Sequence, residues 1–565
     1  MHYLRSADRR IPLFFVILAL LSLVLIAAGC GSDTRAAVAV APTPTPAPTP
    51  TPTATSTAQV RFGDAAADQI LAFEVSIVSP ITVSLDSGAK NSIDFGSKSN
   101  RLELSHMAGK FEPFMTFSLP QGKYKGIELT LADPAVTYVK TSWYKGDFFG
   151  SSGELVSQDF PGNQTVNFTF DPPLVVGSEV SVFNIDFNIA KTLVFSPNDD
   201  HEITGITFSP DTFSFISKPI GPADSQQHQN GELEDVVGTV ASLNGGAILL
   251  NDGQSGAVLT INTDASTKLH DGLDNVVGLA DMLGRVVEVE GYTRANGTMM
   301  AAEIELLAGK TGANTEGVVL DAGNSFDTRN LLSLGHQSSS FSMLAQDATG
   351  NGAQVGDVGW TFTIHTNYLN QLSYEIDYGK CDWSGISQDL SHFLFPFDAQ
   401  HLFPGQRVMV QTSSALPDGD FTHFAATSVE LAQQAVTGTI DAWYPPSDGE
   451  QTASALGMEY NNGGTWFVLR LPHDSFVAAL SGSDHVLAYA GPGTDIELLD
   501  PNNPDLGVGS LVRVRGLMFM PFNDGGFPTA LTSVKHGGNI LTMVARRITE
   551  QQAIVCTGSG SSCNY

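Results

Sequence analysis

An internal repeat in the C-terminal half of the chain constrains the fold more than any other feature. Three passages recur in the same order: a short strand around a glycine, a strand with alternating valines, and an alanine-containing closing strand. The three copies are residues 237–240, 284–291 and 301–306, then 316–319, 405–410 and 425–431, then 436–440 and 509–516 with a close at 530–534 or 545–548. Because Gly238, Gly317 and Gly438 mark unevenly spaced starts, the pattern argues against a solenoid of fixed period.

Each copy is therefore predicted to form its own small β-barrel, since a closed barrel leaves no unpaired strand edges. The predicted barrels are residues 235–309, 314–434 and 435–549, of which the second and third are enlarged, and a Gly/Ser/Cys tail follows at 550–565. The pattern resembles a bacterial family of unknown function numbered fifty-six sixty-six, whose domains look like small OB-type barrels. That resemblance implies a binding fold without choosing a ligand, because OB barrels take oligonucleotides or oligosaccharides.

Residues 59–217 are predicted to form a β-sandwich, immunoglobulin-like or transthyretin-like, so that the whole chain is all-β. Apolar residues alternate along several short runs, which places them on one face of each strand. Two of these runs are Leu71, Phe73, Val75 and Ile77, and Phe183, Ile185, Phe187 and Ile189. Between the members of the second run, Asn184, Asp186 and Asn188 are expected on the opposite, wetter face.

This region also resembles a second bacterial family of unknown function, numbered forty-three eighty-two, which is found in lipoproteins. The resembling segments are residues 63–68, 102–109, 119–124 and 184–188. That family has no established activity, so the resemblance supports the fold and the location and implies no site residues.

The N-terminus predicts the cellular location. A basic start and an apolar run at residues 11–28 lead into Ala27, Ala28 and Gly29 before Cys30. These features resemble bacterial lipoproteins, which implies a signal peptide at 1–29, lipidation of Cys30 and, with Gly31 next to it, the outer membrane. An uncleaved membrane helix is the alternative, but it needs about 20 apolar residues, and this run contains Pro12.

Two linkers separate the predicted parts. Residues 30–58 hold the lipidated cysteine and a Pro/Thr-rich stretch that favours polyproline II. At about 3.1 Å per residue, such a stalk would hold the folded part several nanometres from the membrane. A polar linker, 218–234, separates the sandwich from the first barrel.

Charge argues against a nucleic-acid partner, because 59 acidic and 28 basic residues give a net charge of −31. Glu288, Glu290, Glu303 and Glu305 are expected on the solvated outer face of the first barrel. The third barrel reverses the sign locally, and a solvated face is expected there too, carrying Arg513, Arg515, Arg546 and Arg547.

Motifs for catalysis and metal binding are not found. The 13 histidines have no metal-ligand spacing, and no nucleophile turn is present, so no catalytic residue, cofactor or metal is predicted. In an oxidising compartment Cys556 and Cys563 could form a disulfide, which would leave Cys381 unpaired. The alternative, that all three thiols are free, has equal weight.

Aromatic clusters are the remaining candidates for ligand binding. Exposed rings stack on sugars or dock proteins. Core packing is the default for each residue of the candidate set, Trp143, Tyr144, Phe148, Trp443 and Tyr444.

Two functional hypotheses follow. In the first, the protein is a lipid-anchored, non-enzymatic envelope module that binds glycan or protein, or has a purely structural role. In the second, it is an extracytoplasmic hydrolase whose carboxylates meet only in the folded chain, about 5 to 10 Å apart. The absence of a catalytic motif favours the first.

Overall fold

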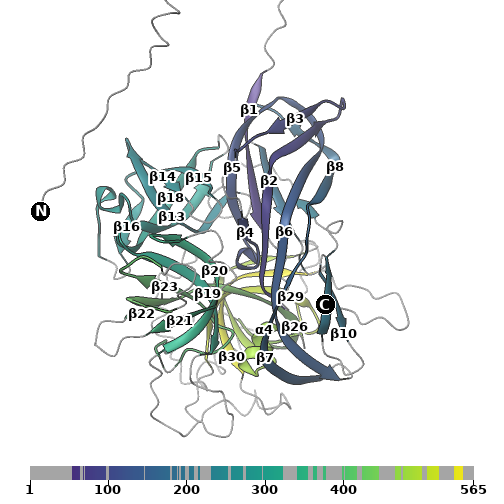
Figure 1. Ribbon diagram of the computed structural model, residues 1–565, viewed down its shortest axis with the longest axis vertical. Coiled ribbons are helices and arrows are strands. Elements are labelled where there is room, and N and C mark those ends of the chain that lie inside the picture. Colours follow the sequence, from purple (N-terminus) through teal and green to yellow (C-terminus); the bar gives the residue numbers. More distant parts are fainter. Residues whose placement is uncertain are drawn as a thin grey trace, which may run out of the picture. The chain divides into compact units, whose positions relative to one another are not determined.

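The computed structural model describes residues 54–63, 68, 70–96, 101–144, 147–178, 181–187, 189, 193–197, 203–208, 214–216, 231–251, 256–271, 275–294, 297–321, 340–353, 361–365, 373–376, 397–399, 401–416, 423–444, 465–472, 475–498, 506–520 and 540–551. The chain divides into two compact units, Met1–Pro52 and Thr53–Tyr565, and all described residues lie in the second. The fold is all-β, as the sequence predicts (Figure 1). None of the helices in the described ranges is long and apolar enough to cross a membrane.

The N-terminal domain is a sandwich of two sheets. One sheet has the order β12-β9-β1-β5, and the other has β3-β2-β6-β7 with β4 on β2 and β8 on β6. A separate hairpin, β10-β11, completes the domain. The strands are β1 (Thr55–Gly63), β2 (Ile70–Leu85), β3 (Lys90–Ile93), β4 (Arg101–Glu103), β5 (Phe111–Pro120), β6 (Gly122–Tyr144), β7 (Asp147–Asp159), β8 (Gln164–Val176), β9 (Ser181–Asp186), β10 (Leu193–Pro197), β11 (Ile203–Phe208) and β12 (Ser214–Ile216).

Two predictions about the faces of these strands are wrong. Asn184, expected on a wet face, is only 1% exposed. Leu71 was expected to share a face with Phe73, but a register irregularity between Ile70 and Ala72 turns it into a different core, shared with the C-terminal repeats. Leu71 therefore lies at a contact between domains.

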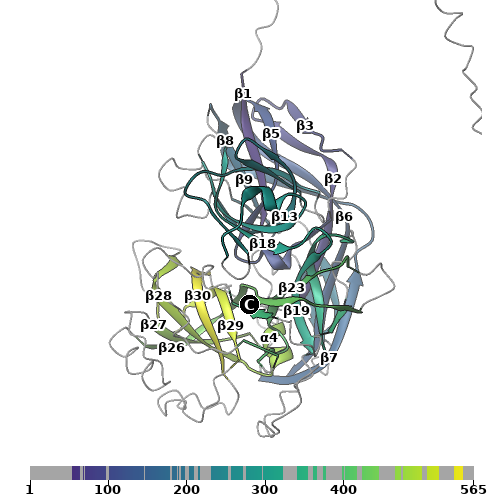
Figure 2. The same ribbon diagram turned by 90° about the vertical axis from the view of Figure 1, so that its left-hand side faces the viewer.

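Repeat 1 forms a barrel in which β13 pairs with β14 and β17, and β15 closes on β18 in parallel (Figure 2). Its first strand begins at Glu232, inside the segment predicted as a linker. The strands are β13 (Glu232–Asn244), β14 (Ala247–Asn251), β15 (Val258–Asn262), β16 (Lys268–Asp271), β17 (Val286–Thr293) and β18 (Met299–Ala308).

Repeat 2 has the same topology. Its seven-stranded sheet runs β22-β25-β23-β19-β20-β21-β24. Only Ala426 and Thr427 separate β24 from β25, and these two strands together take the place that β18 has in repeat 1. They pair in parallel with β21 and β22, respectively. The strands are β19 (Ala313–Asp321), β20 (Ser340–Gly350), β21 (Thr361–His365), β22 (Ser373–Glu375), β23 (Arg407–Thr412), β24 (His423–Ala425) and β25 (Ser428–Leu431).

Repeat 3 is a closed barrel, β26-β27-β28-β30-β29, with a short helix, α4 (Phe476–Ser481), between its second and third strands. The closing strand β30 contains residues 545–548, one of the two predicted closes, while 530–534 lies outside the described residues. The strands are β26 (Gln434–Tyr444), β27 (Thr465–Arg470), β28 (His485–Glu497), β29 (Leu511–Phe519) and β30 (Leu541–Glu550).

The repeated glycines occupy equivalent positions in the three barrels. Gly238 pairs with Val287, and the other two copies pair in the same way, Gly317 with Val408 and Gly438 with Val512. A Cβ at Gly317 would overlap the carbonyl oxygen of Leu344 on the neighbouring strand. The glycine therefore permits the close strand approach that a narrow barrel requires.

Repeats 2 and 3 do not have separate cores, which corrects the expectation of independent barrels for these two, whereas repeat 1 and the sandwich each have a core cluster of their own. One apolar cluster joins repeats 2 and 3, and another joins both of them to Leu71, Ala72 and Val139 of the sandwich. Strands β6 and β7 form an arm that extends from the sandwich to α4 of repeat 3 (Figures 1 and 2).

We predict that Gly317→Ala lowers the free energy of unfolding by about 1–3 kcal/mol, because overpacking forces adjacent strands apart. The matched control is Gly309→Ala, where an added Cβ has no neighbour within 4 Å. Urea unfolding followed by circular dichroism should show a lower midpoint for Gly317→Ala only. Equal midpoints for the two variants would contradict this explanation of the repeat.

Candidate functional site

The segment between β4 and β5, residues 103–112, lies where the sandwich meets the repeats. Glu103 organises it, although this side chain is buried. Its Oε1 accepts hydrogen bonds from Phe73 N at 2.8 Å and Ser105 N at 2.8 Å, and its Oε2 accepts one from His106 N at 2.9 Å. One carboxylate thus fixes both the short 3-10 helix Ser105–Met107 and its position on β2.

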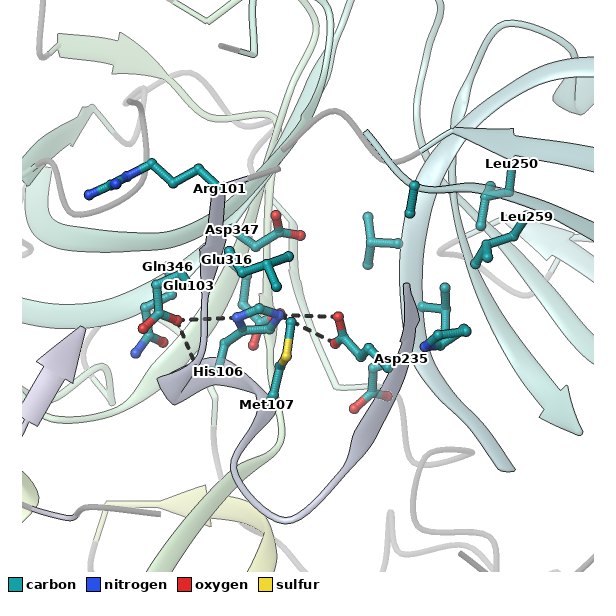
Figure 3. Close-up of a pocket in the computed structure, with 16 residues that line it drawn as sticks. Arg101, Glu103, His106, Met107, Asp235, Leu250, Leu259, Glu316, Gln346 and Asp347 are labelled. Atoms are coloured by element: carbon teal, nitrogen blue, oxygen red, sulfur yellow. Dashed lines mark hydrogen bonds and ion pairs between the residues drawn. The ribbon is translucent and has the colours of Figure 1, made fainter. Parts of the chain in front are cut away.

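His106 lies between two carboxylates (Figure 3). Its Nδ1 is 3.2 Å from Glu103 Oε2, and its Nε2 is 3.3 Å from Glu112. Lys110 Nζ is 2.6 Å from the same Glu112 carboxylate. Burial by itself would lower the pKa of His106, but Glu112 and Glu103 outweigh burial and raise it to about 10.

The pKa of Glu112, one of the two carboxylates beside His106, shifts in the opposite direction. Burial would raise the pKa of Glu112, but Lys110 and His106 outweigh it and hold the pKa well below the usual range. The histidine is therefore a permanent cation at neutral pH. Because a general base must be able to lose its proton near the working pH, His106 is unsuited to that chemistry.

A small cavity of about 30 Å³ borders this group. Its walls come from the sandwich, repeat 1 and repeat 2, and they include Arg101, His106, Asp235, Glu316 and Asp347. A buried water needs about 10–15 Å³ of such volume, so the cavity has room for about two waters. Typical small-molecule sites measure about 300–1,000 Å³.

Three arginines from repeats 2 and 3 hold the 103–112 segment by its backbone. Arg407 donates to the carbonyl oxygens of His106 at 3.0 Å and Ser105 at 3.2 Å. Arg515 donates to Ala108 O at 3.1 Å, and Arg547 donates to Gly109 O at 2.9 Å. We call Arg407, Arg515 and Arg547 the arginine clamp.

The clamp also holds the first residues of repeat 1. Arg515 Nε is 2.9 Å from Glu234, and its Nη2 is 2.6 Å from Asp235. Arg547 contacts Glu232 at 2.6 Å and Glu234 at 3.2 Å. Burial would raise the pKa of Glu234, but the arginines of repeat 3 outweigh it and hold the pKa well below the usual range.

These contacts correct the expectation of two solvated charged faces. Arg515 and Arg547 are buried, and so are Glu288 and Glu305 of repeat 1. Arg546 joins the two faces directly, with its Nη1 3.2 Å from Glu290. Sequence alone shows the sign of each face, but not that the faces meet.

One group of carboxylates has the spacing of a metal site. Oxygen atoms of Asp235, Glu288 and Glu290 lie within 4.8 Å of one another. Two of the three are already paired with cations, Asp235 with Arg515 and Glu290 with Arg546. Arginine therefore supplies positive charge at this group.

The structure separates the predicted ligand-binding aromatics from the clamp. Trp443 and Tyr444 end β26, and the Trp443 ring stacks on Phe467 with centroids 5.6 Å apart. In the β6–β7 hairpin, Trp143 pairs with Phe148 and Tyr144 with Asp147 through the backbone. The predicted lipidation residue, Cys30, and the other cysteines, Cys381, Cys556 and Cys563, lie outside the described residues.

The residues of this junction were not among the predicted site residues. Glu103 and His106 fall in the segment 102–109, which resembles the lipoprotein family, and this was the available signal. The clamp arginines lie on three strands, β23, β29 and β30, and only the two from repeat 3 belonged to a predicted charged face. Their targets are up to 438 residues away in the chain.

We predict that Arg515→Gln lowers the free energy of unfolding by about 3–5 kcal/mol, because it removes the cation paired with Asp235 and one of the three arginines around the buried Glu234. The control is Arg470→Gln, which removes the partly exposed pair with Asp441 and should cost at most about 1 kcal/mol. Urea unfolding of both variants measures this. If the two cost the same, the clamp does not hold the domains together.

We predict that His106→Gln changes the pH dependence of stability. A folded pKa of about 10 against 6.5 in the unfolded chain means that the charged histidine stabilises fully below pH 6.5 and loses this effect as pH rises toward 10. The stability difference between wild type and His106→Gln should therefore be largest at pH 6 and shrink by pH 10. Parallel profiles would contradict it, and His401→Gln, a partly exposed histidine, is the control.

Comparison with known proteins identifies one domain. Residues 237–305 match the family model of a domain of unknown function, DUF5666. The match lies within repeat 1, where the sequence pattern resembles that numbered family; the resemblances of the sandwich and of repeats 2 and 3 stay predictions. Comparison with curated proteins and with solved structures gives no match. The first of the three barrels is thus similar to this uncharacterised family over residues 237–305.

Proposed function

We propose that the protein is a lipid-anchored, non-enzymatic module of the bacterial cell envelope that presents a binding surface to a glycan or an envelope protein. The arginine clamp is the observation that carries this proposal. Because the clamp joins the sandwich to all three repeats through buried charges, the four domains would stay attached to one another at the end of the stalk.

The pairing of the charged groups at the junction supports a structural role for these residues. His106, Lys110 and Glu112 neutralise one another, and the clamp neutralises Glu234 and Asp235. The adjacent cavity of about 30 Å³ is far smaller than an ordinary substrate site. An extracytoplasmic hydrolase would need an accessible pair of carboxylates elsewhere.

The location follows from the sequence. The apolar run before Cys30 and the Pro/Thr-rich stretch after it match an acylated anchor and a spacer. We place the protein at the outer membrane, on its periplasmic or its outer side.

The binding candidates are the aromatics of two strand ends. Trp143 and Phe148 lie opposite each other near the end of the β6–β7 arm, and Trp443 and Tyr444 end β26. Aromatic residues paired across strands at an element's end suit stacking on sugar rings or on a protein partner.

We predict that Cys30→Ser releases the protein from the membrane fraction. We also predict that the double variant Trp143→Ala, Tyr144→Ala weakens ligand capture by about tenfold, because stacking area is lost. The measurements are membrane fractionation with intact mass, and retention on a glycan array and in an envelope-protein pull-down. Phe160→Ala, a sandwich ring that packs on Phe208, is the control for aromatic loss without a binding effect. If the wild-type protein retains no ligand and instead hydrolyses a glycan, the result would reject this proposal in favour of the hydrolase hypothesis.

A further inference from the structure

Four uncharged polar side chains form a row across repeat 2. The backbone register places Thr349 opposite Asn314, Asn314 opposite Gln411, and Gln411 opposite Ser428. Directly opposed residues share a face of the sheet, so the four lie side by side over β20, β19, β23 and β25. We call Thr349, Asn314, Gln411 and Ser428 the polar row.

Every member of the polar row is buried with an unsatisfied atom. The exposed fractions range from 0% for Thr349 to 7% for Gln411. Within the described part of the chain, no hydrogen-bond partner reaches Thr349 Oγ1, Asn314 Oδ1, Gln411 Nε2 or Ser428 Oγ. Folded proteins seldom leave one such atom unpaired, and four in a row indicate hydrogen-bonding groups that await a partner.

The chemistry of the polar row selects a neutral partner. Two amides and two hydroxyls offer both donors and acceptors and carry no charge. The neighbouring row, two residues along each strand, holds three carboxylates and Met409. Asp347 lies opposite Glu316 in this row, and Glu430 lies opposite Met409. Carboxylates accept hydrogen bonds and repel anions, so a hydroxyl-rich neutral ligand fits both rows.

Repeat 1 covers one end of the polar row. Asn314 Nδ2 is 3.7 Å from Met409 Sδ, and Met409 packs against Val286 and Leu307 of repeat 1 in a small apolar patch. Beside Thr349, a Cβ at Gly350 would lie 2.7 Å from a methyl carbon of Val286.

The sandwich face that repeat 1 contacts has the same character. Gln59 donates to Met299 Sδ of repeat 1 at 3.5 Å, and Arg61 donates to the carbonyl oxygen of Glu232. Gln59 Oε1, Arg61 Nε and Asn184 Oδ1 are buried without a hydrogen-bond partner among residues that the structure describes. Burial lowers the pKa of Arg61 to about 10, whereas carboxylates outweigh burial and raise the pKa of Arg515. If repeat 1 moved away, Gln59 and Arg61 would lose these two bonds, and water or a ligand could reach their unpaired atoms, Gln59 Oε1 and Arg61 Nε.

We propose that repeat 1 is a movable cover and that the polar row of repeat 2 binds a glycan segment when the cover opens. The proposal rests on the glycan form of the proposed function and names the face that carries it. Glu232 and Glu234, held by the clamp, form the pivot, because they lie at the first strand of repeat 1.

The test is isothermal titration of the full chain with neutral hexasaccharides of glucose (α-1,4 and β-1,4) and of N-acetylglucosamine, with an acidic hexauronate for comparison. At least one neutral probe should bind and the acidic probe should not. Thr349→Val and Ser428→Ala each delete an unsatisfied hydroxyl, so we expect unchanged or higher thermal stability and about tenfold weaker binding. Ser414→Ala, at an exposed position of repeat 2, is the control and should bind like wild type.

Hydrogen exchange with the bound probe completes the test. We expect amide protection to rise in β19 and β23, where the ligand would bind. We expect it to fall in β17 and β18, the strands of repeat 1 that lie against repeat 2. Two outcomes would overturn the proposal: no neutral probe binds, or a probe binds without these changes and with full affinity for Thr349→Val. Binding that depends on Trp143 or Trp443 but not on the polar row would sustain the proposed function and reject this site.

Discussion

Buried charge is the constraint on which the arrangement of domains depends. A charge removed from water must be paired, because leaving one partner alone costs several kcal/mol. The ion pairs that hold repeat 1 join different domains: Arg515 and Arg547 come from repeat 3, and Glu232 and Glu234 come from repeat 1. The carbonyl oxygens that the clamp also binds belong to the sandwich. The buried polar groups at these contacts are therefore paired only when the domains are together.

The contacts of repeat 1 divide into two physical classes. At its first strand, carboxylates and arginines satisfy one another, and the pKa of Glu234 is held low as a result. Elsewhere its contacts include an apolar patch with Met409, and polar atoms near these contacts, such as Asn314 Oδ1 and Gln59 Oε1, have no hydrogen-bond partner among the described residues. A firm attachment at one point and an unsatisfied surface beyond it are the properties of a part that pivots. This combination connects the rigid junction to ligand binding.

Local pattern was sufficient to predict the architecture, whereas the site depends on contacts that local pattern does not encode. The alternation of apolar residues in Phe183–Ile189 predicted strands, and the repeated glycines at 238, 317 and 438 predicted barrels. Both patterns can be read within a few residues of the sequence. Arg547 and Gly109 are 438 residues apart, and nothing near either one shows that they meet. For the same reason, a buried arginine on β29 was mistaken for a solvated one: period-two alternation gives the face of a strand but not what covers it.

Calorimetric unfolding of the complete folded part tests the central claim most directly, since it counts the cooperative units. If the arginine clamp and the shared cores make the domains interdependent, the sandwich and the three barrels should unfold in one transition whose calorimetric and van't Hoff enthalpies agree. Several separate transitions, each with the enthalpy of a domain of about 100 residues, would contradict the account.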